Sequence, residues 1–240
     1  MSLASQILNL FFPARCPVCN EIGQRHLHLC DNCAENIGRI TDRCLGCGNP
    51  RTGCTCSKHK FTLFLASPFI YENKLRESIH RFKFSGETDL AKFFGKETAK
   101  VVAKEFGDVK IDVVTCVPQT KRKRRKRGYN QSALLAKEIA KNLSLPYDEL
   151  LLIKTRETAD QHGLKGNARM KNLKDAFAAD NPESVKDKTI LLCDDVKTTG
   201  ATLNECRKTL IKAGAKAVCC ATIAVTPEKI TYNLSLTNFM

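Results

Sequence analysis

Two acidic residues, Asp194 and Asp195, stand where the sequence passes from an apolar segment to the turn Thr198-Thr199-Gly200. Residues 188–193 before them predict a buried strand, and residues 201–213 after the turn predict a helix. Ligands of α/β proteins bind at the carboxyl ends of strands, and free N–H groups at a helix start suit phosphate. Carboxylates at such a place accept hydrogen bonds from sugar hydroxyls, with Mg²⁺ to offset the charge. The pattern predicts a site for a phosphorylated sugar. The alternative is a capped helix with two surface aspartates.

The cysteines form a second group of chemically active residues. Eight of the thirteen lie before residue 57, in four close pairs. In a reducing cytoplasm this density indicates metal binding rather than disulfides. The first predicted zinc set consists of Cys16, Cys19, Cys30 and Cys33, and the second of Cys44, Cys47, Cys54 and Cys56.

These spacings predict one or two structural zinc ions, because four thiolates close a tetrahedron and a segment this small needs metal to fold. Spacing alone leaves open a cross-braced pairing of Cys16 and Cys19 with Cys44 and Cys47, and also unliganded reduced thiols. The other five cysteines stand among apolar neighbours and are interpreted as core residues.

A run of seven basic residues carries half of the formal net charge of +14. Such a run indicates a polyanionic partner, or a solvated and mobile loop, or a contact to the phosphates of the sugar ligand. Nucleic acid is one such polyanion, but only Tyr129 adjoins the run and no stripe of aromatic residues is visible, so direct readout of bases is not supported. The residues of the run are Lys121, Arg122, Lys123, Arg124, Arg125, Lys126 and Arg127.

The elements that must position these groups follow from hydrophobic periodicity. Strands are predicted within residues 61–71, 111–117, 188–193 and 217–225, and helices at 74–84, 89–106, 131–143 and 201–213. This alternation predicts an α/β domain, a mostly parallel sheet flanked by helices. On the helix 74–84, four residues are interpreted as a solvated face: Arg76, His80, Arg81 and Lys83. The polar segment 155–175 has no clear period and predicts a long loop that is either functional or disordered.

Composition divides the chain into a cysteine-rich domain at residues 1–60 and an α/β domain at residues 61–240. The apolar residues 7–12 lack the basic region of a signal peptide, and no segment reaches the roughly 20 apolar residues that cross a bilayer. We therefore expect a cytoplasmic protein without a transmembrane segment. Peripheral contact with the inner membrane is the alternative.

The run from Asp194 to Thr202 resembles the signature with which type I phosphoribosyltransferases bind phosphoribosyl pyrophosphate (PRPP). This resemblance implies that Asp194 and Asp195 hold the ribose hydroxyls. It implies that the 5′-phosphate is held by Thr198, Thr199, Gly200, Ala201 and Thr202. Lys197 replaces the apolar residue often found at its position.

Over nearly the whole chain the sequence is similar to the ComF/ComFC/GntX family of competence-associated, phosphoribosyltransferase-like proteins. The resemblance is carried by the cysteine pairs, the block Arg127-Gly128-Tyr129-Asn130-Gln131, and Gln161, Arg169 and Asn172. It implies a type I phosphoribosyltransferase fold behind a double zinc ribbon. It implies a role in DNA uptake, with single-stranded DNA and DNA-uptake helicase or translocation proteins as partners.

The same resemblance implies further site residues. Val117, Pro118 and Gln119 would form the pyrophosphate loop, and Arg156, Lys165 and Arg169 would act from a mobile hood over the substrate, with Gln161 beside them. Two functions stay open. One is transfer of phosphoribose from Mg²⁺-PRPP to an unknown acceptor. The other is a non-catalytic single-stranded-DNA-binding accessory in which PRPP is an effector or the site is vestigial.

Overall fold

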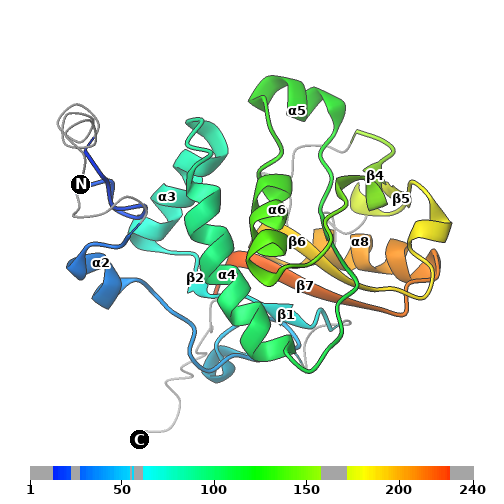
Figure 1. Ribbon diagram of the computed structural model, residues 1–240, viewed down its shortest axis with the longest axis horizontal. Coiled ribbons are helices and arrows are strands. Elements are labelled where there is room, and N and C mark those ends of the chain that lie inside the picture. The colour runs from blue at the N-terminus through cyan, green and yellow to red at the C-terminus, as the bar shows by residue number, and fades with distance from the viewer. Residues whose placement is uncertain (1–12, 23–27, 55, 57–61, 158–171, 228–240) are drawn as a thin grey trace, which may run out of the picture.

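The computed structural model describes residues 13–22, 28–54, 56, 62–157 and 172–227 (Figure 1). Its centre is a parallel sheet in the order β1 (Leu65–Ala66), β7 (Ala217–Val225), β6 (Thr189–Lys197), β3 (Val113–Cys116). β2 (Phe69–Ile70) also pairs with β7 in parallel. The predicted α/β class with a mostly parallel sheet is confirmed. In the described residues, no helix is both long and apolar enough to cross a membrane.

β6 is longer than the predicted strand. The sequence predicted that it ends before the two aspartates, but pairing with β7 continues from Asp194, opposite Thr222, to Lys197, opposite Val225. Because the backbone at Asp194 and Asp195 belongs to the sheet, these carboxylates are anchored by a strand rather than by a loop.

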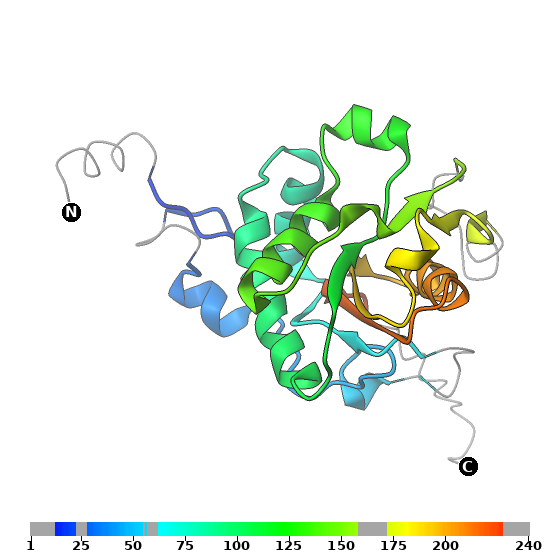
Figure 2. The same ribbon diagram turned by 45° about the vertical axis from the view of Figure 1, so that its right-hand side comes forward.

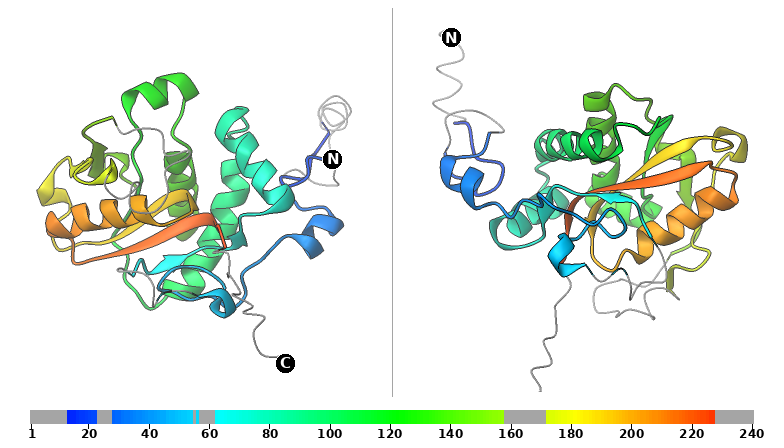
Figure 3. Two further views of the ribbon diagram at one scale, coloured as in Figure 1. Left: turned by 180° about the vertical axis from the view of Figure 1, so that it is seen from behind. Right: turned by 90° about the horizontal axis from the view of Figure 1, so that it is seen from below.

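Helices cover both faces of the sheet (Figures 1 to 3). α3 (Asn73–Phe84), α4 (Leu90–Phe106) and α6 (Gln131–Leu143) share one core with Leu191 and Cys193 of β6. α8 (Ala201–Lys212) shares the other core with Ile190 and Leu192. This alternation is what a strand buried on both faces requires, since successive side chains point to opposite sides.

The predicted loop at residues 155–175 is flanked by two short strands that the sequence did not reveal. β4 (Leu152–Lys154), which follows the 3₁₀ turn η3 (Glu149–Leu151), pairs antiparallel with β5 (Phe177–Ala179), which precedes η4 (Pro182–Ser184). Strands this short show no period of two. Residues 158–171 lie outside the described part of the chain.

The basic run forms the helix α5 (Lys121–Arg127), so the interpretation as a mobile loop was wrong about its backbone. Lysine and arginine are good helix formers, and both ends are capped. The Thr120 side chain accepts a hydrogen bond from the Lys123 N–H, and Gly128 ends the helix at φ 83°. None of its residues is buried, so solvent and nearby carboxylates reduce the repulsion among the charges, as in the ion pair of Arg124 with Glu149 at 2.9 Å.

The cysteine-rich segment holds the helix α2 (Asp31–Asn36) and the 3₁₀ turn η1 (Arg51–Gly53). It packs directly on the α/β domain, because Cys16, Val18, Cys33 and Ile37 belong to the same core as α3 and α4.

Candidate functional site

Most of the residues predicted to hold a phosphorylated sugar line a single cavity. We call this cavity, of about 550 Å³ at the carboxyl ends of β3 and β6, the aspartate pocket. Its lining includes Val117, Pro118, Gln119, Asp194, Asp195, Thr198 and Thr202. Two predicted loops that are far apart in the sequence therefore meet, as the parallel order of β3 and β6 requires.

The turn after β6 has the backbone that a phosphate cradle needs. Gly200 adopts φ 75°, a conformation that glycine reaches without steric cost, and α8 starts at the next residue. Thr198 and Thr199 are exposed on this turn, whereas Ala201 packs into the core beneath α8. The Thr199 hydroxyl accepts a hydrogen bond from the Ala201 N–H at 3.4 Å.

The two aspartates are held by different neighbours. Asp194 Oδ1 accepts from the Ser132 hydroxyl at 2.7 Å and from the Asp195 N–H at 2.9 Å. Asp195 accepts from Gln131 Nε2 at 2.7 Å and forms an ion pair with Lys83 Nζ at 2.8 Å. With both carboxylates fixed in this way, little rotational freedom is left to lose when a ligand binds.

The electrostatic surroundings of the pocket shift the pKa values of Asp194 and Lys83. Burial, with the neighbouring charge of Asp195, raises the pKa of Asp194 to about 7. The pKa of Lys83 is raised, because the charge of Asp195 and its hydrogen bond outweigh the burial that would lower it. Near neutral pH, Asp194 can therefore act either as an acceptor or as a donor, while Lys83 stays charged beside Asp195.

The block Arg127–Gln131 joins α5 to the pocket. Asn130 caps α6 by accepting from the Ser132 N–H, and it also donates to the Val117 carbonyl at 3.2 Å. The Gln131 side-chain oxygen accepts from Gln119 at 2.5 Å and from Arg127. Gln131 thereby connects the loop after β3 with Asp195.

Lys83 is a pocket residue that the sequence did not predict, as is Ser132. The interpretation of Lys83 as part of a solvated helix face was wrong, and so was that of Arg81, which donates to the carbonyls of Pro17 and Val18. A lysine between two phenylalanines carries no motif, and only the packing of α3 beside β6 reveals its partner.

The predicted hood residues do not gather at the pocket in the described part of the chain. Arg156 is exposed and donates to the carbonyls of Asn172, at 3.1 Å, and Lys174, at 2.6 Å. It therefore joins the described residues before the segment 158–171 to those after it. Gln161, Lys165 and Arg169 fall within that segment and lie outside the described residues.

The eight predicted zinc ligands form two separate groups of four, in which the sulfur atoms lie within 4.8 Å of one another. Sulfur–sulfur distances are 3.6 Å for Cys19 and Cys30 and 3.4 Å for Cys44 and Cys56. A tetrahedral site with Zn–S bonds of about 2.3 Å has edges of about 3.8 Å, so both groups fit a structural zinc ion. The first group is Cys16, Cys19, Cys30 and Cys33 and the second is Cys44, Cys47, Cys54 and Cys56, which rules out the cross-braced alternative.

Comparison with known proteins agrees with this two-part architecture. Residues 7–60 match the family described as double zinc ribbon domain, and residues 129–233 match the phosphoribosyl transferase domain. The DNA utilization protein YhgH of Escherichia coli is 30% identical over 219 residues, which cover 87% of this chain and 96% of that protein. Competence protein F of Haemophilus influenzae is 32% identical over 152 residues, or 62% of this chain and 66% of that one.

The chain belongs to the ComF family. Among solved structures, the glutamine PRPP amidotransferase of Bacillus subtilis is similar to this ComF-family chain with a TM-score of 0.40 and 21% identity. That match covers 59% of this chain and 30% of the amidotransferase. In the ComF-family chain the two cysteine groups form the double zinc ribbon, and the aspartate pocket lies in the phosphoribosyltransferase-type domain.

Proposed function

We propose that this ComF-family protein binds Mg²⁺-PRPP in the aspartate pocket and transfers its phosphoribosyl group in a process of DNA uptake or DNA use. The observation that carries the proposal is the pair Asp194 and Asp195, fixed by Ser132, Gln131 and Lys83 in a cavity that both predicted phosphate loops line. The alternative was a capped helix with two surface aspartates. The burial of Asp195, which is only 6% exposed, argues against this alternative.

Each part of the pocket has a role in this proposal. Asp194 and Asp195 accept hydrogen bonds from the two ribose hydroxyls. The 5′-phosphate lies on the turn Thr198–Thr202, where backbone N–H groups and threonine hydroxyls donate to it. Val117, Pro118 and Gln119 border the pyrophosphate. A bound Mg²⁺ supplies positive charge that offsets the pyrophosphate oxygens.

The reaction is a displacement at the anomeric carbon. The acceptor lone pair forms a bond to that carbon, the bond to the pyrophosphate oxygen breaks, and the acceptor loses a proton. The transition state has oxocarbenium character, as in glycoside hydrolysis. Arg156, Lys165 and Arg169 are proposed as the catalytic residues, whose positive charges would stabilise the charge on the leaving pyrophosphate.

A second function is favoured by the names of the relatives, DNA utilization protein and competence protein F, together with the exposed basic helix α5. In that case the protein is a single-stranded-DNA-binding accessory, recruited to DNA-uptake helicase or translocation proteins, and PRPP is an effector. Both functions include binding of PRPP in the aspartate pocket, but only the first includes catalytic transfer of its phosphoribosyl group.

The test is calorimetric titration of Mg²⁺-PRPP into zinc-loaded protein. We expect binding by the wild type, loss of binding in Asp194→Asn/Asp195→Asn, and retention in Asp108→Asn/Asp180→Asn, which removes the same charge from two exposed positions. Absence of binding by folded wild-type protein would refute the proposal. Pyrophosphate release on addition of candidate acceptors then separates an enzyme from a PRPP-regulated accessory.

A further inference from the structure

The seven charges of α5 are not equivalent in the folded protein. Arg122, Lys123, Lys126 and Arg127 line a groove of about 460 Å³ between α5 and the end of α3, which we call the α5 groove. Lys121, Arg124 and Arg125 line a separate hollow. The helical period produces this division, because residues three and four apart share a face. In Figures 1 and 2, α5 stands at the same edge of the molecule as the end of α3.

Two aromatic residues, Phe84 and Tyr129, line the α5 groove together with its charges. Phe84, the last residue of α3, is 52% exposed, although it is a large apolar side chain. The Arg127 guanidinium lies over its ring, with Cζ 4.8 Å from the centroid. Tyr129 lines the same groove and is fixed by its hydroxyl, which donates to the Phe82 carbonyl at 2.5 Å. An exposed ring beside cations, as Phe84 is here, is a surface on which an unpaired base can stack.

The α5 groove opens onto the aspartate pocket. Lys83, Phe84, Lys123 and Arg127 line both cavities. Arg127 also donates to Gln131, whose amide in turn donates to Asp195. A planar ring on Phe84 would therefore lie at the mouth of the cavity that holds the aspartates, while groups attached to that ring extend along Arg122 and Lys126.

We propose that the α5 groove binds a nucleotide, with its unpaired base stacked on Phe84 and its phosphate on Arg122 and Lys126. The base lies at the wall shared with the aspartate pocket. This chemistry has two sources, a free mononucleotide or a single strand. The inference rests on the proposed function in one respect only: if Mg²⁺-PRPP binds the pocket, the shared wall couples the two ligands, and each changes the affinity of the other by the same factor.

The first test compares the two faces of α5. Binding of fluorescent oligothymidylate is measured by anisotropy over a range of salt concentrations for Arg122→Ala/Lys126→Ala and for Lys121→Ala/Arg125→Ala. Each phosphate contact to a single strand contributes about 0.7 to the slope of log affinity against log salt. Because Arg122 and Lys126 share one phosphate, we expect the groove pair to lower the slope by about 0.7 and the matched pair to leave it near the wild-type value. Equal loss in both pairs would overturn the proposal, because α5 would then act only as a diffuse charge.

The second test addresses the base. Phe84→Leu should weaken binding of oligothymidylate by about ten-fold and leave binding of an abasic strand of equal length unchanged, since one stacked base contributes about 1–3 kcal/mol. Equal loss for both strands would contradict stacking. Helical content measured by circular dichroism confirms that Phe84→Leu folds.

Competition identifies the source of the nucleotide. Displacement by free thymidine monophosphate indicates a mononucleotide, and displacement by strands alone indicates a polynucleotide. Failure of every nucleotide to bind would sink the inference. Mg²⁺-PRPP calorimetry on Arg122→Ala/Lys126→Ala, whose side chains do not line the aspartate pocket, separates this failure from failure of the proposed function.

Discussion

The two cysteine groups have the same ligands but different attachments to the α/β domain. The first group lies against α3, where the Ser78 hydroxyl donates to the Pro17 carbonyl at 2.6 Å and Arg81 donates to the same carbonyl at 3.0 Å. The second group lies beside the chain that enters β1, where the Leu65 N–H donates to the Leu45 carbonyl at 2.7 Å. A Cβ on Gly48 would meet Leu65 Cδ2 at 2.6 Å, so this contact is close.

The attachment of the first group matters because of where α3 ends. Ser78 and Arg81 hold the ribbon, and Lys83, two residues after Arg81, holds Asp195. A single helix end therefore touches both the zinc knuckle and the aspartate pocket. The second group is joined to β1, an edge strand that carries no residue of the pocket. Two similar cysteine groups in one chain thus have different positions, one next to the candidate ligand site and one at the edge of the sheet.

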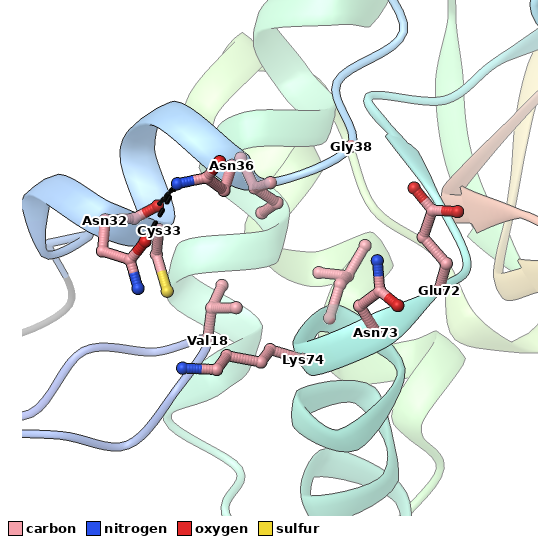
Figure 4. Close-up of a pocket in the computed structure, with 10 residues that line it drawn as sticks. Val18, Asn32, Cys33, Asn36, Gly38, Glu72, Asn73 and Lys74 are labelled. Carbon is pink, nitrogen blue, oxygen red and sulfur yellow. Dashed lines mark hydrogen bonds between the residues drawn. The ribbon is translucent and has the colours of Figure 1, made fainter.

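A cavity of about 230 Å³ lies at the junction of the first group with α3 (Figure 4). Figure 4 shows Val18 and Cys33 on the ribbon side and Glu72, Asn73 and Lys74 on the α3 side. Beside this cavity, Ser78 and Arg81 add directional hydrogen bonds to the apolar contacts that Cys16 and Val18 make in the shared core.

The largest effect is expected when each cysteine group is disrupted in turn and the two variants are compared. Cys16→Ser/Cys19→Ser and Cys47→Ser/Cys54→Ser should each lower the zinc content by one ion per chain, because a site with two thiolates cannot close a tetrahedron. Zinc binding to small domains contributes about 10–16 kcal/mol to their folding, so each ribbon should unfold locally. Loss of the first site should also speed hydrogen exchange in the last turn of α3 and weaken Mg²⁺-PRPP binding.

Elemental analysis, hydrogen-exchange mass spectrometry and calorimetry on the same samples make these measurements. The second variant is the matched control, with the same chemistry and the same number of substitutions. If hydrogen exchange in the last turn of α3 is equally fast in the two variants, the proposed link between the first ribbon and the pocket is wrong.

A smaller effect is expected when α3 is separated from the pocket but left attached to the ribbon. Lys83→Met leaves Asp195, only 6% exposed, without its ion-pair partner. Removing one partner of a buried ion pair lowers stability by about 3–5 kcal/mol. Because the Lys83 side chain is 18% exposed, we expect a loss at the lower end of this range. Urea denaturation measures the loss of stability, and the zinc content should not change.

Lys92→Met is the control for this prediction. Lys92 pairs with Asp89 at 2.6 Å on the same domain, but both side chains are more than half exposed, at 56% and 65%. We expect no measurable change in urea denaturation, because solvent screens exposed pairs. A similar loss in both variants would mean that Lys83 is an ordinary surface charge.

The sequence predicted the residues that form local patterns much better than the residues that connect the first ribbon and the pocket through α3. The cysteine pairs are a local pattern, so two groups of four could be predicted, although spacing left a cross-braced pairing open. The segment from Asp194 to Thr202 is also a local pattern, so its place between a buried strand and a helix could be predicted. Lys83, Ser78 and Arg81 carry no local pattern, because their partners stand far away in the chain at Asp195 and Pro17. Likewise, nothing in the sequence distinguishes among the seven basic residues of α5, whereas the helix places them on two faces.

The smallest predicted effect tests the ribbon side of α3. Ser78→Ala removes the 2.6 Å hydrogen bond to the Pro17 carbonyl at a fully buried position and leaves that carbonyl with Arg81 as a donor. A hydrogen bond of this kind contributes about 1 kcal/mol to stability. We expect the first group to release zinc a few-fold faster to a chelator, while release from the second group stays at the wild-type rate. Ser184→Ala is the matched control, because Ser184 donates to the Asn181 carbonyl at 2.7 Å in a solvent-accessible turn far from either ribbon in sequence. Faster release from both groups, or the same release in both variants, would show that Ser78 does not join the first ribbon to α3.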